Sequence, residues 1–367
     1  MHPPIPPAEA LSLLSLGRDA FIDVRSPGEF AEGHIPGFVN LPVLNDEERH
    51  RVGLTYKNAG QERAIETGHE LVEPAKRERV ARWVEAARAQ PSGRAIVTCW
   101  RGGLRSKISE QWIRETGTDV LRVQGGYKAL RRELLQTPET PPSLAILTGL
   151  TGTGKTKLLE EVPVPKIDLE RLANHRGSAF GHDLFNPQPS QTTFENRLAI
   201  AMRRAGPRAL TEDESRKVGN VMLPNAFKER MKTSPVIVLE SPLWARVELI
   251  FDGYIREPIL RGKSKTEVRA HMLKQLDLLV KQLGGALHAE LRAQLLSAFD
   301  SETTLEAHSD WIRGLLLRHY DPRYRHAFGR QERKILFQGD YYACHQFLIY
   351  WFNELAKNGG QPEMVRA

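Results

Sequence analysis

The sequence predicts an α/β protein with two domains, each built around a parallel β-sheet. Short apolar runs alternate with helical stretches along the chain, which is the pattern of parallel strands joined by helices. Residues 136–143 interrupt this pattern, because three prolines among eight residues suit neither a helix nor a central strand. A length of 367 residues has room for two domains. We therefore place one domain at residues 1–140 and a second at residues 141–367.

The first domain is predicted to contain three buried strands and a long helix between the first two. The strands are residues 20–24, 95–98 and 120–123, and the helix is residues 73–89. The second domain is predicted to contain three further parallel strands and a helix that stops at Gly284-Gly285. These strands are residues 144–148, 165–169 and 236–239, and the helix is residues 268–283. Apolar periodicity predicts that roughly the last 110 residues are mostly helical.

Composition and charge exclude several classes of protein. The chain is 40% hydrophobic and 26% charged, as expected of globular domains, and no apolar run approaches the roughly 18 residues that a membrane helix needs. The first seven residues lack the basic start and apolar core of a secretory signal. Two cysteines, Cys99 and Cys344, cannot form a disulfide framework. We expect a cytoplasmic protein with no membrane partner.

The basic excess lies in the second domain. Residues 1–140 contain 20 Lys and Arg against 19 Asp and Glu, whereas residues 141–367 contain 32 against 26. A sequence pI near 9.4 permits a polyanionic partner such as nucleic acid. A solvated, arginine-rich surface explains the same charge, so charge alone does not choose between the two.

Residues 149–156 form a phosphate-binding loop. They read Gly-Leu-Thr-Gly-Thr-Gly-Lys-Thr and match G-x-x-x-x-G-K-[ST], between a predicted strand and a helix. The glycines let backbone N–H groups turn towards phosphate oxygens, and the helix N-terminus adds positive potential. The predicted diphosphate-binding residues are Gly149, Gly152, Thr153, Gly154, Lys155 and Thr156. ATP and GTP are the usual ligands, but any diphosphate ester has the same head group.

A divalent cation such as Mg²⁺ could bind beside this loop, with Thr156 as one ligand. An acidic residue at the end of another strand would then be expected to help hold it. The candidates are Asp168, Glu212-Asp213-Glu214 and Glu240. Each could equally be a solvated acid, and the sequence does not choose among them.

A second anion-binding loop is predicted where a buried strand ends at Cys99 and a helix opens. The loop consists of Trp100, Arg101, Gly102, Gly103, Leu104 and Arg105. Backbone N–H groups and two arginines favour the Cys99 thiolate and would bind phosphate, thiosulfate or selenophosphate. A structural cysteine in an apolar core would not need two glycines and two arginines around it, so that alternative explains the loop poorly. The C-x5-R spacing has the length found in cysteine phosphatases.

Several stretches of the first domain resemble the rhodanese family, whose cysteine loop more often has one residue fewer. They are residues 23–30, 33–37, 40–42 and 125–127, and the resemblance spans about residues 8–137. It implies a rhodanese-like parallel-sheet domain. The phosphate loop and the apolar periodicity predict that a P-loop NTPase-like α/β domain with a helical C-terminal part follows it. The family resemblance also makes His34 a packing residue of a turn rather than a general base.

The whole chain resembles the tRNA 2-selenouridine synthases. The cysteine loop at 99–106 carries this resemblance together with residues 168–170, 173–181, 188–191, 194–196, 212–216 and 320–324. The resemblance implies a transferase that converts wobble 2-thiouridine in tRNA to 2-selenouridine, using selenophosphate after S-geranylation by geranyl diphosphate. The S-geranyl thiol would be the better leaving group. From this chemistry we expect Lys155 to assist departure of the diphosphate and Cys99 to receive selenium, with Arg101 and Arg105 holding selenophosphate.

Two other functions are compatible with the same motifs. One is a cysteine phosphatase or thiosulfate sulfurtransferase with a regulatory NTPase module. The other is a non-catalytic RNA-binding protein with relic loops, against which the intact Cys99 and Lys155 argue. The tRNAs used, nucleotide binding and the oligomeric state are not readable from the sequence.

Residues 313–334 are the predicted tRNA-binding segment. They contain seven Lys and Arg against two acids, and Tyr320, Tyr324 and Phe328 lie among them. Basic groups neutralise phosphates, and aromatic rings stack on unpaired bases. We expect Arg323, Tyr324 and Arg325 to contact the anticodon region. The alternative is an amphipathic helix with its aromatic side chains in the core and its arginines solvated.

Overall fold

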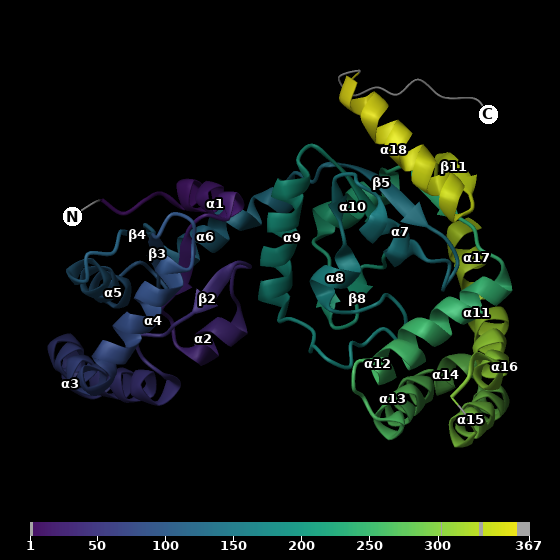
Figure 1. Cartoon of the computed structure of the whole chain (residues 1–367), viewed down its shortest axis with the longest axis horizontal. Coiled ribbons are helices and arrows are strands. Elements are labelled where there is room, and N and C mark those ends of the chain that lie inside the picture. The colour runs from purple at the N-terminus through teal and green to yellow at the C-terminus, as the bar shows by residue number, and fades with distance from the viewer. Residues whose placement is uncertain (1–2, 302, 330–332, 358–367) are drawn as a thin grey trace. The chain divides into compact units, whose positions relative to one another are not determined.

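The computed structural model describes residues 3–301, 303–329 and 333–357 (Figure 1). The chain divides into two compact units. Unit 1 comprises Met1–Glu139 with Ser190–Ile200, and unit 2 comprises Thr140–Pro189 with Ala201–Ala367. The chain therefore passes from one unit to the other within the proline-rich segment. Residues 190–200 belong to unit 1, although they follow the phosphate loop in the sequence.

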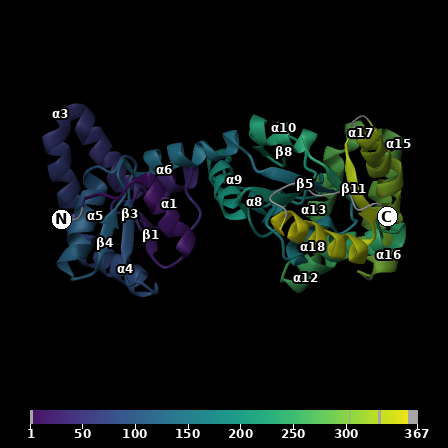
Figure 2. The ribbon, with the colours of Figure 1, turned by 90° about the horizontal axis from the view of Figure 1, so that it is seen from above.

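Unit 1 contains a four-stranded parallel sheet with the strand order β2-β1-β3-β4. The strands are β1 (Ala20–Asp23), β2 (Phe38–Asn40), β3 (Ala95–Thr98) and β4 (Val120–Arg122). The three predicted strands are confirmed, and β2 is an addition at the edge. Helices α1 (Pro7–Leu16) and α6 (Gly126–Leu135) pack on one face of the sheet, and α4 (Lys76–Arg88) and α5 (Leu104–Glu115) pack on the other (Figure 2).

The alternation of side chains along the strands produces these two layers. Phe21 and Ile96 point into the core beneath α1 and α6. Ile22 and Val97 point the other way and pack with Trp83 of α4. Because both faces are covered, the strands are apolar throughout, which is why the sequence identifies them.

The sequence did not reveal the helical element α3 (Asp46–Val72), which precedes the predicted helix. Gly60 interrupts α3 with a left-handed φ of 82°, and only Ala64 and Val72 of its 27 residues are buried. An element that buries so little has no clear apolar period to read. The predicted helix at residues 73–89 is a 3-10 turn (Glu73–Ala75) followed by α4. The short helix α2 (Pro27–Glu32) follows β1.

Unit 2 contains a five-stranded parallel sheet with the strand order β11-β10-β5-β7-β6. The strands are β5 (Ser143–Thr148), β6 (Lys166–Ile167), β7 (Arg208–Glu212), β10 (Val236–Leu239) and β11 (Ile335–Gly339). The predicted strand at 165–169 is shorter than expected, because the Asp168 side chain caps the helix α8 (Leu169–Ala173). β11 interrupts the part of the chain that was expected to be mostly helical.

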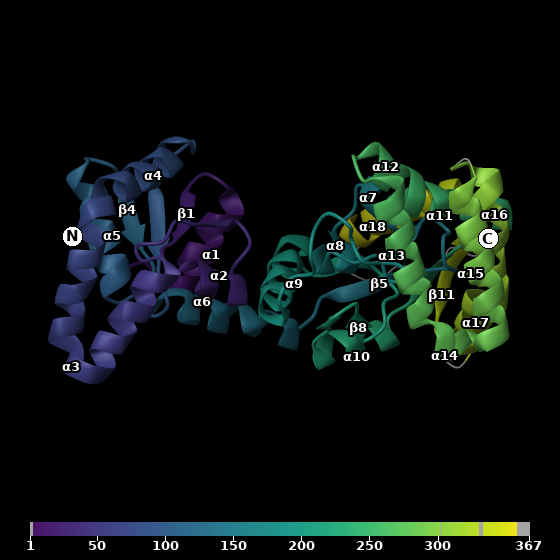
Figure 3. The same ribbon diagram turned by 90° about the horizontal axis from the view of Figure 1, so that it is seen from below.

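Helices cover both faces of this sheet. α7 (Lys155–Glu161) and α18 (Tyr341–Lys357) lie on one side of β5, and α10 (Asn225–Thr233) lies on the other (Figure 3). Cys344 of α18 is fully buried against this sheet and belongs to its apolar core. In the described part of the chain no helix is both long and apolar enough to span a membrane.

A helical group completes unit 2 around a second apolar core. It consists of α11 (Leu243–Phe251), α12 (Glu257–Leu260), α13 (Lys265–Leu278), α14 (Val280–Leu283), α15 (Gly285–Asp300), α16 (Leu305–Leu315) and α17 (Asp321–Gly329). The helix predicted at 268–283 corresponds to α13 and α14 and ends at Gly284, whose φ is 77°. The remaining elements are α9 (Gln191–Ala205) and the hairpin β8 (Lys217–Val218) and β9 (Val221–Met222).

Candidate active sites

The Cys99 loop connects β3 to the N-terminus of α5 in unit 1. Cys99 is 3% exposed, and its Sγ donates to Ser106 Oγ at 3.2 Å. Among the described residues, no group accepts a hydrogen bond from the backbone N–H groups of residues 100–103, and no side chain caps α5. Unsatisfied N–H groups at a helix N-terminus bind anions, and a hydroxyl beside the sulfur can stabilise a thiolate. The loop can therefore bind an anion beside the Cys99 thiol.

The turn after β4 supports this loop through direct backbone contacts. The N–H of Tyr127 donates to the Cys99 carbonyl at 2.8 Å, and the N–H of Lys128 donates to the Trp100 carbonyl at 3.0 Å. A Cβ on Gly126 would lie 2.2 Å from the Cys99 carbonyl oxygen, and Gly126 also has a left-handed φ of 62°. Glycine is thus required at this position for the loop to take its shape.

The two arginines of the loop differ in their environment. Arg105 forms a bidentate ion pair with Glu29 of α2, at 2.5 and 3.1 Å. Burial opposes the charge on Glu29, but Arg105 holds the pKa of this carboxyl below its ordinary value. Arg101 is exposed, and Trp100 stacks on Tyr127 with ring centroids 5.6 Å apart. Arg105 would therefore have to exchange Glu29 for an incoming anion, whereas Arg101 is exposed to solvent.

His34 lies outside this loop and packs within unit 1. Its ring stacks on Phe30 at 4.3 Å, and Nδ1 is 3.2 Å from the Phe30 carbonyl. Its backbone N–H donates to Thr193 Oγ1 of α9, and its carbonyl accepts from Asn196. These contacts agree with the predicted packing role.

The phosphate loop connects β5 to α7 in unit 2. A Cβ on Gly149 would lie 2.4 Å from the Leu239 carbonyl oxygen, and one on Gly152 would lie 3.0 Å from the Arg246 carbonyl oxygen. The loop thus runs against the backbone of β10 and α11, which explains both glycines. Gly154 precedes α7 with a φ of 91° and offers no side-chain cap. The N-terminus of α7 is therefore open to an anion.

Lys155 and Thr156, at the end of this loop, form hydrogen bonds to other groups of the protein. Lys155 Nζ donates to the carbonyls of Gly149 and Leu150 at 2.8 and 3.1 Å. Burial lowers the pKa of Lys155, and the nearby Glu170 opposes that shift. Thr156 Oγ1 donates to the Glu170 carboxylate at 2.7 Å. A diphosphate would offer Lys155 a negatively charged partner in place of two carbonyls.

The acid beside Thr156 is Glu170, which was not among the predicted acids. Asp168 caps α8 by accepting from the Arg171 N–H at 2.8 Å. Glu212 is buried and accepts from the Glu170 N–H at 2.9 Å. Asp213 accepts from Thr148 Oγ1 at 2.9 Å and from Arg333 at 2.8 Å. Glu240, a further candidate, is exposed.

Buried carboxyl groups surround Lys155 and Thr156. Burial raises the pKa of Glu170 and that of Glu212, and burial with the neighbouring Glu170 raises the pKa of Glu214 to about 8. Acids that repel one another in this way suit a cationic partner. Among the described residues, no three Asp, Glu, His or Cys side chains form a ready-made metal cage. Such a site fits Mg²⁺, which takes most of its ligands from water and substrate phosphates.

A buried ion pair that the sequence did not reveal fixes the phosphate loop to the helical group. Arg246 of α11 pairs with Asp321 of α17 at 2.6 and 3.0 Å, and both side chains are almost fully buried. Arg246 Nε also donates to the Thr151 carbonyl at 2.8 Å. The partners lie 75 residues apart, so no local motif indicates the contact. Removing one partner would leave a buried charge uncompensated.

The expected tRNA-binding segment is only partly exposed. Tyr324 Oη lies 2.9 Å from Thr148 Oγ1 beside the phosphate loop, and Tyr320 packs against the helical core. Both tyrosines are partly buried and line the phosphate-loop cavity, so a contact between their rings and an RNA base stays a prediction and would be made at this cavity. Arg333 is buried against Asp213, Arg318 pairs with Glu290, and Arg330 and Glu332 lie outside the described residues.

The other cations of this segment are all exposed, namely Arg313, Arg323, Arg325 and Lys334, and of these Arg323 lines the phosphate-loop cavity. This cavity has a volume of about 990 Å³. It shares Thr151, Ile250 and Tyr254 with a narrow apolar recess. The recess is walled by Phe180, Met272, Trp311, Ile312, Leu315 and Leu316. The recess holds only about 20 Å³, so the apolar surface available beside a head group on the loop is the wall of the cavity itself, at Leu249, Ile250 and Ala327.

The fold and the two loops define a class of protein in which a rhodanese-like domain is joined to a P-loop domain. Residues 6–133 match the rhodanese-like domain family, and residues 142–354 match the family described as tRNA 2-selenouridine synthase AAA domain. The chain belongs to the tRNA 2-selenouridine synthase family.

Full-length relatives carry the same family name. The tRNA 2-selenouridine synthase of Marinobacter nauticus is 42% identical over 87% of this chain and 90% of its own length. That of Shewanella denitrificans is 40% identical over 96% of this chain and 99% of its own length. Among solved structures, the N-terminal domain of a putative ATP/GTP binding protein from Clostridium difficile is 32% identical. It covers 36% of this chain and 99% of its own, with a TM-score of 0.33.

Proposed function

We propose that this protein converts 2-thiouridine at the wobble position of tRNA to 2-selenouridine in two steps, one on each anion-binding loop. The observation that carries the proposal is that both loops are intact, with Cys99 and Lys155 in place, in a chain of this family. Sulfide is a poor leaving group from a ring carbon, whereas an alkylated sulfur leaves readily as a thiol. Alkylation would therefore precede replacement by selenium.

The phosphate loop is proposed to bind geranyl diphosphate for the alkylation step. The 2-thiouridine sulfur forms a bond to C1 of the geranyl group while the C1–O bond breaks, and diphosphate leaves with the bonding electrons. Lys155 and the N-terminus of α7 would stabilise the departing charge. Apolar side chains in the wall of the phosphate-loop cavity, among them Leu249, Ile250 and Ala327, would offer a prenyl chain an apolar surface and so support this ligand.

Mg²⁺ is proposed to bind at Thr156 and Glu170, next to the diphosphate. When bound, the ion would offset negative charge on the diphosphate and on the surrounding acids. Thr156 and Glu170 already contact each other, and burial raises the pKa of Glu170 despite the nearby Lys155, so a further cation would stabilise the ionised carboxyl group.

The Cys99 loop is proposed to release selenium from selenophosphate by accepting its phosphoryl group. The thiolate attacks phosphorus, the P–Se bond breaks, and hydrogen selenide leaves; water then hydrolyses the S–P bond to regenerate the thiol and phosphate. Hydrogen selenide adds to C2 of S-geranyl-2-thiouridine, and geranyl thiol departs. The expected Cys99 selenium adduct would require an S–Se bond, whose formation removes two electrons that no component of this scheme accepts. The C-x5-R spacing, with Ser106 beside the sulfur, suits a phosphoryl group.

Arg323 and Arg325 are proposed to bind tRNA phosphates. Each neutralised phosphate releases counterions, so replacing both arginines by alanine should weaken tRNA binding and lower the slope of log K against log salt by about one to two units. Filter binding over a salt series measures this slope. Replacing Arg230 and Lys232 of α10 by alanine removes the same charge from another exposed site and should leave the slope unchanged. An unchanged slope in the Arg323 and Arg325 variant would place the RNA elsewhere.

A reconstituted assay tests the proposed function directly. The purified full chain is incubated with 2-thiouridine anticodon stem-loop RNA, geranyl diphosphate and selenophosphate, and the nucleosides are analysed by mass spectrometry. We expect S-geranyl-2-thiouridine with geranyl diphosphate alone and 2-selenouridine when selenophosphate is added. Phosphatase or ATPase turnover without either modified nucleoside would favour the alternative of a cysteine phosphatase or sulfurtransferase with an NTPase module.

A further inference from the structure

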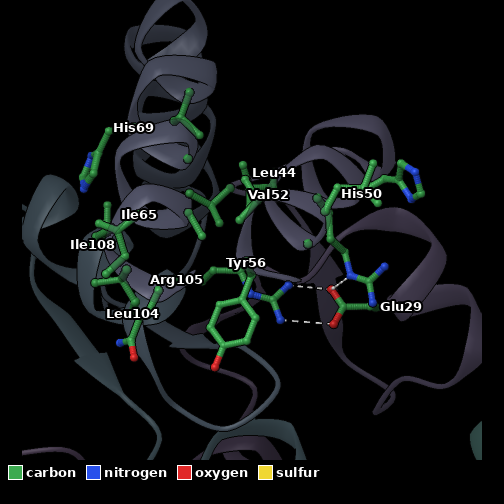
Figure 4. A pocket seen from close by; sticks show the side chains of 18 of the residues that line it. Glu29, Leu44, His50, Val52, Tyr56, Ile65, His69, Leu104, Arg105 and Ile108 are labelled. Carbon is green, nitrogen blue, oxygen red and sulfur yellow. Dashed lines mark hydrogen bonds and ion pairs between the residues drawn. The ribbon is translucent and has the colours of Figure 1, made fainter. Parts of the chain in front are cut away.

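Unit 1 contains an apolar cavity of about 650 Å³ between α3 and α5, next to the Cys99 loop (Figure 4). Val52, Leu54 and Tyr56 of α3 line it from one side, and Leu104 and Ile108 of α5 line it from the other. Leu54, Tyr56 and Leu104 are 46%, 59% and 46% exposed, although all three are large and apolar. Grouped exposed apolar side chains of this kind mark a binding site, and the volume is that of a small-molecule site.

The cavity adjoins the Cys99 loop directly. Leu104 and Arg105 belong both to the Cys99 loop and to the cavity wall. Figure 4 shows the Arg105–Glu29 ion pair near Tyr56, with Ile65 and Ile108 away from it at the left of the view. The next residue, Ser106, contacts the Cys99 sulfur at 3.2 Å. A group held in the cavity would therefore lie beside an anion bound near Cys99.

The charges around the cavity indicate what kind of molecule carries the apolar group. Arg49, His50, Lys57 and His69 also line it. Glu29 is the one acid of the lining, and it is paired with Arg49 and Arg105. An apolar interior with basic residues around it suits a ligand in which an apolar chain is attached to a polyanion. A neutral lipid lacks the negative charge, and the backbone of an acidic peptide lacks the apolar chain.

We infer that this cavity holds the geranyl group of the S-geranyl-2-thiouridine intermediate during selenium transfer. The inference rests on the proposed function and adds to it a second prenyl site, separate from the phosphate-loop cavity. The intermediate joins a ten-carbon apolar chain to an RNA, which matches the apolar interior and basic surround. Binding the chain here presents C2 of the nucleoside to selenide released at the Cys99 loop.

Gly53 offers a way to fill the cavity without disturbing the fold. It lines the cavity within α3, has ordinary helical geometry, and no atom lies within 4 Å of a Cβ placed on it. Gly53→Phe therefore adds a ring where there is space. Leu54→Glu, at a half-exposed position, instead makes the wall polar. Glu62→Phe is the matched control, because Glu62 is an exposed residue of α3 outside the lining.

The test compares two purified RNA substrates, carrying S-geranyl- or S-methyl-2-thiouridine at the wobble position, in selenophosphate-dependent formation of 2-selenouridine. Each buried methylene contributes roughly fourfold, so wild-type kcat/KM should favour the geranyl substrate by at least about a hundredfold. Gly53→Phe and Leu54→Glu should lose at least about tenfold on the geranyl substrate and retain wild-type activity on the methyl substrate. Both should geranylate 2-thiouridine RNA normally, and Glu62→Phe should behave as wild type throughout.

Two results with the variants would overturn the inference, and one result with the wild-type protein would overturn the proposed function. Equal loss on both substrates would mean that the cavity holds another part of the RNA or a second protein surface. No loss on either would mean that the cavity is not used. If the wild-type protein makes no 2-selenouridine from the geranyl substrate, the proposed function itself fails. If the wild-type protein is active on the geranyl substrate and Gly53→Phe is equally active, only this inference fails and the proposed function stands.

Discussion

Replacing Cys99 by serine should abolish 2-selenouridine formation and leave S-geranyl-2-thiouridine as the accumulating product. The serine hydroxyl keeps the size of the side chain but is not ionised at neutral pH, so the loop would retain its anion-binding site and lose its nucleophile. Loss of a catalytic nucleophile lowers turnover by at least about 10³-fold. Because the phosphate loop lies in a separate unit, geranylation of 2-thiouridine RNA should continue at the wild-type rate.

Cys344→Ser is the matched control for this variant. Cys344 is buried in α18, where burial raises the pKa of its thiol to about 12, so it has no reactive thiolate at neutral pH. This variant should retain both activities if it folds. Normal 2-selenouridine from Cys99→Ser would end the assignment of Cys99 as the nucleophile.

A trapped intermediate identifies what Cys99 accepts. Wild-type protein mixed with selenophosphate and quenched should carry a phosphoryl group on the Cys99 peptide, without the selenium isotope pattern. A selenium-containing Cys99 peptide would contradict attack on phosphorus and would require an electron acceptor that the scheme lacks.

Replacing Lys155 by alanine should block the earlier step. Losing one charge-assisted contact to a diphosphate costs about 1.5–3 kcal/mol, which corresponds to roughly a 10- to 150-fold slower geranylation. Lys232→Ala is the matched control, because Lys232 is an exposed lysine of α10 in the same unit and outside the lining of the phosphate-loop cavity. The measurement is the rate of S-geranyl-2-thiouridine formation at subsaturating geranyl diphosphate.

Lys155→Ala should still convert RNA that already carries the S-geranyl group. This second readout separates a defect in the phosphate loop from general misfolding, since selenium transfer depends on unit 1. Geranylation at the wild-type rate in Lys155→Ala would mean that the loop serves a different ligand.

Local sequence signals predicted much of both folds and both loops. The phosphate loop is a contiguous motif between a buried strand and a helix, and the strands of both sheets are apolar because both of their faces are covered. α3 escaped prediction because it buries only two residues, and its exposed apolar side chains line a cavity instead of a core. β11 was not predicted because it is a short edge strand between helices and its residues are partly exposed.

The parts of the sites that sequence reasoning missed depend on contacts between distant segments. Glu170 reaches Thr156 from α8, and Arg246 reaches both Thr151 and Asp321. Nothing in the spacing of these residues indicates that they meet. The hydrogen bond of Tyr324 to Thr148 is a further contact of this kind, because the composition of residues 313–334 does not indicate that this tyrosine lies beside the phosphate loop.

An ordered assay with the two loop variants tests most directly whether the loops carry out successive steps. 2-Thiouridine RNA is first incubated with Cys99→Ser and geranyl diphosphate, purified, and then given to Lys155→Ala with selenophosphate. We predict S-geranyl-2-thiouridine after the first incubation and 2-selenouridine after the second, although neither variant forms 2-selenouridine efficiently from 2-thiouridine RNA. Reversing the order should leave no 2-selenouridine. Failure of the forward order with folded proteins, or equal product in both orders, would contradict the division of the reaction between Cys99 and Lys155.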